Sequence, residues 1–111
     1  MNKVSTIDLQ NYRTPGSRVF TGRDRGIDVR KKSDIDNLET QSDEISIIIP
    51  EDLGSINPSF LEEFLFNVVV KLKSDGFFKK FRFINNGRYK IDTDLQEAVE
   101  RILREETALV H

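Results

Sequence analysis

The sequence predicts a small α/β domain: a mixed sheet of about four strands with helices packed mainly on one side. Apolar patterns with the period of a strand and with the period of a helix alternate along the chain, which is typical of this class. The 111 residues are enough for one hydrophobic core and too few for two, so we expect a single domain over residues 1–111. A hydrophobic content of 37% and eight phenylalanines support a folded globule.

The central unit of the predicted fold spans residues 44–72. It opens with a β-branched run that predicts a strand covered on both faces and ended by Pro50, namely Ile45, Ile47, Ile48 and Ile49. A helix then begins at Pro58, because Asn57 can cap the first free amides and proline loses no hydrogen bond at the first helical position. The apolar residues of this helix recur at helical spacing: Phe60, Leu61, Phe64, Leu65, Val68, Val69 and Leu72.

The N-terminal third contains weaker signals. Residues 1–15 predict an edge strand followed by a turn, and residues 17–20 predict a second short strand. Thr21 is a candidate N-cap with Asp24 three residues later, which indicates a helix to about Ser33.

Three glycines and one polar segment mark special positions. Gly22 and Gly26 lie four residues apart in the predicted first helix, which indicates that this helix closely approaches the sheet or a loop. The functional alternative is backbone contact with phosphate, but the chain lacks a Gly-x-Gly-x-x-Gly or Gly-Lys-Ser/Thr motif. Gly76 is suited to cap the C-terminus of the second helix, and the acidic residues 34–43 predict a linker with little structure.

The C-terminal third predicts one more strand and one more helix. Residues 81–84 alternate as a strand, and Asn86-Gly87 predicts a turn into a short extension over 88–91. Thr93 and Gln96 form a capping box for the last helix, and we expect residues 107–111 to fray. The apolar face of that helix is Leu95, Ala98, Val99, Ile102 and Leu103.

Composition argues against several classes of protein. No run approaches the roughly 20 apolar residues of a membrane span, and the N-terminus lacks an apolar signal-peptide core. The chain has no cysteine, so it has no disulfide, thiolate metal site or cysteine nucleophile, and we expect a cytoplasmic protein. The single histidine is the last residue, which leaves no histidine-based nucleophile pair.

We therefore predict a protein that is not an enzyme, with no catalytic residue, no cofactor and no metal. The carboxylate pairs are adjacent in sequence and diverge in direction, unlike a facing acid and base: Glu51/Asp52, Glu62/Glu63 and Glu105/Glu106. A hard cation held by oxygen atoms of Glu51, Asp52 and Asn57 is the alternative.

Charge is distributed unevenly along the chain. Residues 1–33 carry eight basic and three acidic side chains, residues 34–66 carry nine acidic and no basic ones, and residues 67–111 carry nine basic and seven acidic ones. Such asymmetry can steer a charged partner. The simpler alternative is that these charges form solvated faces. Direct nucleic-acid binding is disfavoured, because the net charge is −2 and no aromatic residues lie between the arginine and lysine residues of the segment 23–32.

Three stretches resemble a known family. Ile56-Asn-Pro-Ser-Phe-Leu-Glu-Glu-Phe64, directly after a hydrophobic strand, resembles the signature of bacterial STAS-like domains, relatives of the sulfate transporter and anti-sigma factor antagonist domains. Residues 17–30 are similar to the family's entry into its first helix, and residues 81–86 to its last core strand. The resemblance extends roughly from Gly16 to Glu105, and it implies a fold more directly than an activity.

The resemblance also implies a site. In anti-sigma factor antagonists of this type, an Asp-Ser pair at the start of the corresponding helix is phosphorylated by a partner kinase, and the added charge breaks the complex. The Asp corresponds to Asn57 and the phosphoacceptor to Pro58, which has no hydroxyl, so Ser59 becomes the substitute acceptor. The alternative is that Asn57 and Ser59 only cap the helix.

Residues 56–70 form the predicted partner-binding surface, in which Phe66 and Val70 point away from the main apolar stripe of the helix. The alternative is that the N-terminal segment or the last helix covers these two side chains. The predicted partner-binding residues are Ile56, Asn57, Pro58, Ser59, Glu62, Glu63, Phe66 and Val70.

Two functional hypotheses follow. The first is an anti-sigma-factor-antagonist-like module that binds a protein partner, of which a histidine-kinase-like ATPase is one candidate, through residues 56–70. The second is a small inhibitor from a phage or mobile element that uses the acidic segment 34–66 to block a nucleic-acid-binding protein by occupying its basic site. A homodimer through an edge strand is compatible with either.

Overall fold

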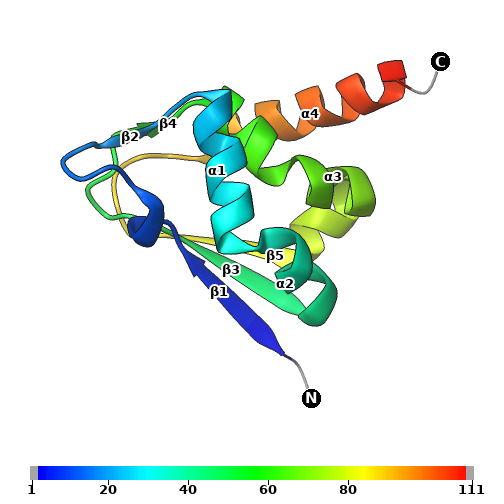
Figure 1. Ribbon diagram of the computed structural model, residues 1–111, viewed down its shortest axis with the longest axis horizontal. Helices are drawn as coiled ribbons and strands as arrows, with labels where there is room; N and C mark the ends of the chain where they lie inside the picture. The colour runs from blue at the N-terminus through cyan, green and yellow to red at the C-terminus, as the bar shows by residue number, and fades with distance from the viewer. Residues whose placement is uncertain (1–2, 110–111) are drawn as a thin grey trace.

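A computed structural model describes residues 3–109, with side chains described for residues 3–106. Four α-helices lie on one side of a three-stranded parallel sheet (Figure 1). The strand order is β1-β3-β5, in which β1 is Val4–Asp8, β3 is Glu44–Ile49 and β5 is Phe81–Asn85. The predicted α/β class, the edge position of β1 and the placement of the helices on one side are confirmed.

The prediction of a four-stranded mixed sheet is wrong. The strand predicted near residues 17–20 is β2 (Val19–Phe20), and it pairs in parallel with β4 (Ser55–Ile56) as a separate two-stranded sheet. No strand is predicted at residues 55–56, which lie between the predicted strand ended by Pro50 and the helix that begins at Pro58. Residues 88–91 are not a strand, so β5 has no antiparallel neighbour, and every strand pair among the described residues is parallel.

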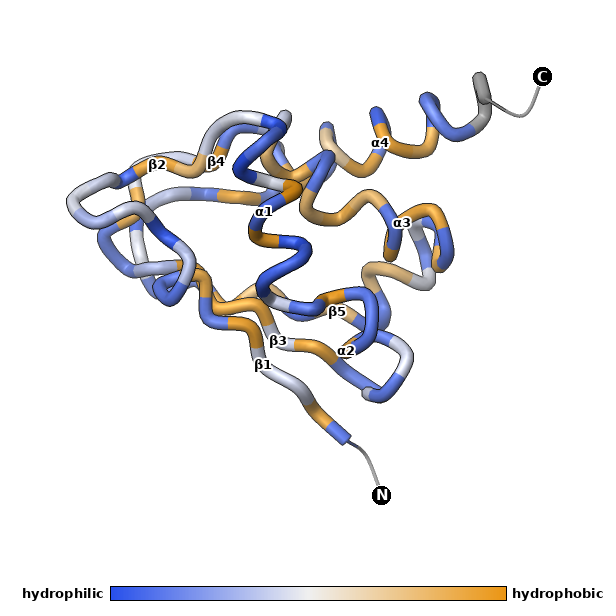
Figure 2. The backbone as a smooth tube through the Cα atoms, viewed as in Figure 1, coloured by the Kyte–Doolittle hydropathy of each residue, from blue (hydrophilic) through white to orange (hydrophobic). Residues whose placement is uncertain are grey.

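The central strand β3 is covered on one face only. Ile45, Ile47 and Ile49 are buried, whereas Ile48 and Ser46 are only partly covered. The prediction that both faces of this strand are covered is therefore wrong. Figure 2 shows apolar residues concentrated along β3 and the first half of α3 (Pro58–Lys80), while α1 (Arg23–Ser33) is largely hydrophilic.

The first helical layer differs from the prediction at two points. A short 3₁₀ helix (Leu9–Tyr12) follows β1, and the N-cap of α1 is Gly22, at φ 94°, not Thr21. Residues 34–43, predicted to be a linker, contain helix α2 (Ile35–Gln41). This helix forms because Ile35 is buried in the core and Glu39 finds two lysine partners elsewhere in the chain.

Helix α3 continues past its predicted end. It bends at Lys73, whose backbone (φ 61°, ψ 179°) is not helical, and the second half buries Phe77 in the core. Gly76 therefore lies inside a helix instead of capping its end. The last helix, α4 (Asp92–Leu109), buries four of its five predicted apolar residues, and Leu103 is partly buried. It extends beyond Glu106, where fraying was predicted, and residues 110–111 lie outside the described residues.

Glu39 of α2 connects the two halves of α3. Its carboxylate lies 2.7 Å from Nζ of Lys71, before the bend, and 2.8 Å from Nζ of Lys80, after the bend. Lys80 also donates a hydrogen bond of 2.6 Å to the Glu39 backbone carbonyl. Because Glu39 is only 2% exposed, its charge is satisfied almost entirely by these lysines, and α2 fixes the bend.

The bend at Lys73 yields a stability prediction. A side chain at this φ and ψ costs roughly 1–3 kcal/mol, and glycine adopts the conformation without that cost. We expect Lys73→Gly to raise the free energy of unfolding by about 1 kcal/mol, after the larger unfolded-state entropy of glycine is subtracted. Lys73→Ala is the matched control, because it also removes the 3.4 Å ion pair with Glu106 but retains Cβ. Urea denaturation measures the free energy of unfolding of both variants. A Lys73→Gly variant that is no more stable than Lys73→Ala would contradict the prediction.

The Glu39 contacts yield a pH prediction. Burial alone would raise the pKa of Glu39, but hydrogen bonds from Lys71 and Lys80 outweigh it and leave the pKa below its usual value. The resulting stability is present above the pKa of the unfolded chain and is lost as the pH falls through the lower folded-state pKa. We expect Glu39→Gln to cost roughly 1–3 kcal/mol at neutral pH and less below about pH 4.

Chemical denaturation from pH 7 to pH 3 measures this difference. The control is Glu100→Gln, an exposed residue on α4, for which we expect little change at any pH. If the loss of unfolding free energy caused by Glu39→Gln stayed constant down to pH 3, the Glu39 carboxylate would not be the ionised group responsible for the stability.

Candidate functional site

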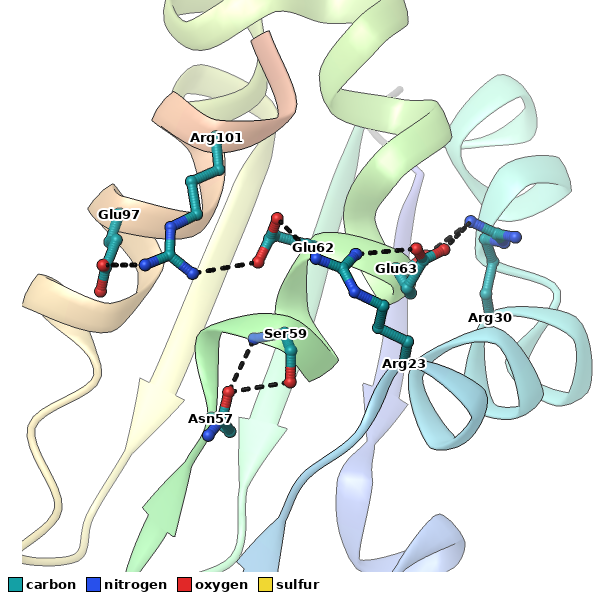
Figure 3. Close-up of polar contacts among 8 residues, drawn as sticks. All are labelled: Arg23, Arg30, Asn57, Ser59, Glu62, Glu63, Glu97 and Arg101. Carbon is teal, nitrogen blue, oxygen red and sulfur yellow. Dashed lines mark hydrogen bonds and ion pairs between the residues drawn. The ribbon is translucent and has the colours of Figure 1, made fainter. Parts of the chain in front are cut away.

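The predicted site lies at the N-terminal end of α3, where β4 leads directly into the helix. Asn57 caps this end: its Oδ1 accepts hydrogen bonds from the backbone N–H of Ser59 (2.9 Å) and from the Ser59 hydroxyl (2.8 Å) (Figure 3). Pro58 occupies the first turn. The predicted cap at Asn57 and the helix start at Pro58 are confirmed, and the Ser59 hydroxyl forms part of the cap.

The structure leaves only part of the predicted binding surface accessible. Asn57 is exposed, and Pro58, Ser59 and Glu63 are partly exposed. Ile56 and Glu62 are buried, at 1% and 3% exposure. Phe66 and Val70 are partly buried and pack against the core, so neither is the fully exposed side chain that the partner-binding prediction required. The accessible surface is therefore the first turn of α3 and not the whole of residues 56–70.

Glu62 is a buried carboxylate held between two helices. Its Oε1 lies 3.5 Å from Nη2 of Arg23 on α1, and its Oε2 lies 3.4 Å from Nη1 of Arg101 on α4. The sequence analysis placed Glu62 on the partner-binding surface and assigned it no partner within the chain. The structure adds that this charge joins α1, α3 and α4 at one point.

Glu63 extends this cluster along α1. Arg23 Nη1 lies 3.1 Å from Glu63 Oε1, and Arg30 Nη1 lies 3.9 Å from Oε2 and donates a 2.6 Å hydrogen bond to the Glu63 backbone carbonyl. On the other side, Arg101 Nη2 pairs with Glu97 Oε1 at 2.6 Å. We call these six residues the arginine–glutamate network (Figure 3): Arg23, Arg30, Glu62, Glu63, Glu97 and Arg101.

Gly26 allows α1 to approach α3 closely enough for this network. A Cβ at Gly26 would lie 2.5 Å from the Phe60 carbonyl oxygen and 2.9 Å from Glu63 Cβ. A close approach is thus present at Gly26, but its neighbour is α3 and not the sheet or a loop that was predicted. No pattern in the sequence indicated which element this glycine would contact. The prediction is wrong for Gly22, where a Cβ would meet nothing within 4 Å.

Tyr89 supports the site from the opposite side, and sequence reasoning did not single it out. Its hydroxyl oxygen lies 3.1 Å from the Ile56 carbonyl oxygen and 2.5 Å from Asp94 Oδ2, two acceptors for one proton. Burial, and secondly the hydrogen bond to Asp94, raise the pKa of the Tyr89 hydroxyl. Tyr89 therefore links the start of α4 to the residue just before the Asn57 cap, as a neutral hydrogen-bond donor.

The loop that contains the candidate cation ligands Glu51 and Asp52 is stabilised by an ion pair between Arg13 and Asp52. Arg13 Nη1 lies 2.7 Å from Asp52 Oδ1, and Arg13 Nη2 donates to the Ser17 carbonyl at 2.7 Å. The hydrogen bond from Arg13 lowers the pKa of Asp52. Within the described residues, no group of three histidine, cysteine, aspartate or glutamate side chains is arranged to hold a metal ion.

Comparisons of the chain with protein-family models, with curated proteins and with solved structures gave no match. The STAS-like resemblance therefore depends on the quoted residues alone. None of the helices within residues 3–109 combines the length and apolar character needed to cross a membrane.

The close approach at Gly26 can be tested by adding one methyl group. We expect Gly26→Ala to lower the free energy of unfolding by roughly 2 kcal/mol, because the new Cβ would clash with the backbone of α3. Gly76→Ala is the control, since its Cβ would meet only the Leu72 side chain, at 3.2 Å, and alanine favours a helix. Thermal or urea unfolding measures both. A neutral Gly26→Ala would contradict the described packing.

Proposed function

We propose that this chain is a STAS-like regulatory module without enzymatic activity that binds a protein partner at the first turn of α3 and the arginine–glutamate network. The observation that carries the proposal is the position of Ser59. Ser59 is partly exposed, and it lies three and four residues before Glu62 and Glu63, on the same side of the helix. A charge added at Ser59 would therefore act directly on the contacts that join α1 to α3.

The proposed switch follows from the charges around Ser59. A phosphate adds roughly −1.5 to −2 charges at neutral pH, and the N-terminus of a helix favours this charge. It would also repel Glu62 and Glu63 and compete with them for Arg23, which pairs with both carboxylates. Loss of Arg23 from Glu62 weakens the attachment of α1 to α3, and this change is what a partner would detect.

The accessible part of the network suits a polar partner surface. Arg23 and Arg101 have side chains that are 53% and 45% exposed, and a shallow hollow beside them is also lined by Arg104 and Glu105. A surface with charges of both signs favours salt-sensitive, charge-complementary recognition. A histidine-kinase-like ATPase remains the candidate partner that the resemblance implies.

The inhibitor hypothesis receives less support from the structure. Among ion pairs between side chains of residues 3–106, five of the nine acidic side chains in residues 34–66 have a basic partner: Glu39, Glu44, Asp52, Glu62 and Glu63. Much of the negative charge is therefore neutralised internally, which leaves less of it for an external basic site.

Affinity purification from the native host, followed by mass spectrometry, tests the proposal. We expect wild-type protein to retain a specific partner and Ser59→Glu to release it, whereas Ser59→Ala retains it. Arg104→Glu, at the rim of the hollow, should weaken retention at least about tenfold, because it reverses one charge of a surface proposed to bind by charge complementarity. The matched control Lys32→Glu makes the same charge change on α1, at a side chain that is 64% exposed.

Circular dichroism of each purified variant separates loss of binding from loss of folding. Phe66→Glu is unsuitable as a probe, because Phe66 packs against the core. A partner that is retained equally by wild type, Ser59→Glu and Arg104→Glu would overturn the proposal.

A further inference from the structure

The three-stranded sheet has one face that no element among the described residues covers. All four α-helices lie on the opposite side (Figure 1). Parallel sheets occur almost only with both faces covered, so an open face on a sheet of this type is unusual. Val4 is 52% exposed and Ile84 is 40% exposed, and both point to the open face by the alternation along their strands.

The open face combines aliphatic and charged residues. The strand register places Ile48 of β3 next to Ile84 of β5, and Ser46 next to Thr6 and Arg82. Glu44 lies at the start of β3, and its Oε1 is 3.1 Å from Nε of Arg82. The Arg82 side chain remains 61% exposed and that of Glu44 36% exposed, so each has room for a second ionic partner.

We infer that this face binds a second copy of the same chain, as a symmetric dimer with the two sheets stacked face to face. The face carries an acidic and a basic group on adjacent strands, so it is complementary in charge to itself. In a two-fold dimer, Glu44 of each chain can bind Arg82 of the other copy, and the pair forms twice. This inference is independent of the partner-binding proposal, which concerns the other side of the molecule.

The spacing of the residues is compatible with a single two-fold axis. With strands about 4.8 Å apart and a rise of about 3.3 Å per residue, we can place an axis between the sheets that relates Glu44 of one copy to Arg82 of the other. The same axis brings Ile48 and Ile84 over Val4 of the second copy. The strands of the two sheets then cross at about 70°, which is nearer to the orthogonal class of sheet packing than to the aligned class.

The size of the face sets the expected affinity. Three strands of five or six residues give a surface of roughly 14 by 17 Å, or about 240 Å² in projection. A stable interface usually buries about 800 Å² per partner, so we expect a weak dimer that forms only at high protein concentration.

Sedimentation equilibrium over a range of concentrations tests the inference. We expect wild-type protein to dimerise, and Glu44→Arg and Arg82→Glu each to weaken the dimer at least about tenfold, since each places like charges opposite one another. An equimolar mixture of the two variants should restore the dimer. In the mixed dimer, each contact between position 44 of one chain and position 82 of the other again joins opposite charges. The control Lys79→Glu makes the same charge change as Arg82→Glu, at an exposed residue of α3.

Mixing the two variants shows whether Glu44 and Arg82 act between chains or within one chain. An ion pair lost within each chain is not restored by mixing, whereas contacts between the two chains are. Recovery of the dimer on mixing, with Lys79→Glu unchanged, supports the inference. A wild-type protein that is monomeric at the highest accessible concentration would overturn it, and so would a dimer that both variants retain.

Discussion

The close approach of α1 to α3 at Gly26 is the constraint on which the site depends. With a hydrogen in place of a methyl group, α1 lies against the Phe60 carbonyl and the Glu63 side chain. Arg23 and Arg30 then reach the two adjacent carboxylates of α3 from one side, and Arg101 of α4 reaches Glu62 from the other. Removing one partner of a buried ion pair is more costly than the pair is stabilising, so the position of each helix is coupled to that of the others.

This coupling explains why a small chemical change at the first turn of α3 can have consequences beyond that turn. The Asn57 cap, the Ser59 hydroxyl and Glu62 lie within two turns of one helix, and Tyr89 connects the preceding strand to α4. A charge introduced there acts on arginines that belong to other helices. Ile56 and Glu62 are themselves buried, so the side chains with accessible surface at this site are those of their neighbours.

The sequence predicted the parts of the structure that depend on residues close together in the sequence. The β-branched run of β3, the Asn57-Pro58 helix start and the apolar face of α4 are local patterns, and each forms the element predicted for it. The errors concern contacts between distant segments. Helix α2 depends on the ion pairs of Glu39 with two lysines of α3. Strand β4 depends on its pairing with β2. Glu62 can be buried because Arg23, earlier in the chain, and Arg101, later in the chain, pair with its carboxylate. No local pattern in the sequence marks those partners.

Amide hydrogen exchange on wild type and Ser59→Glu is the sharpest test of the coupling between the first turn of α3 and α1, because it needs no identified partner. We expect amides of α1 to exchange faster in Ser59→Glu, since the added charge draws Arg23 away from Glu62 and Glu63, while amides of β3 keep their protection. A matched Ser74→Glu variant, in the second half of α3, should leave α1 unchanged. Identical protection of α1 in wild type and Ser59→Glu would mean that the first turn of α3 and α1 are not coupled.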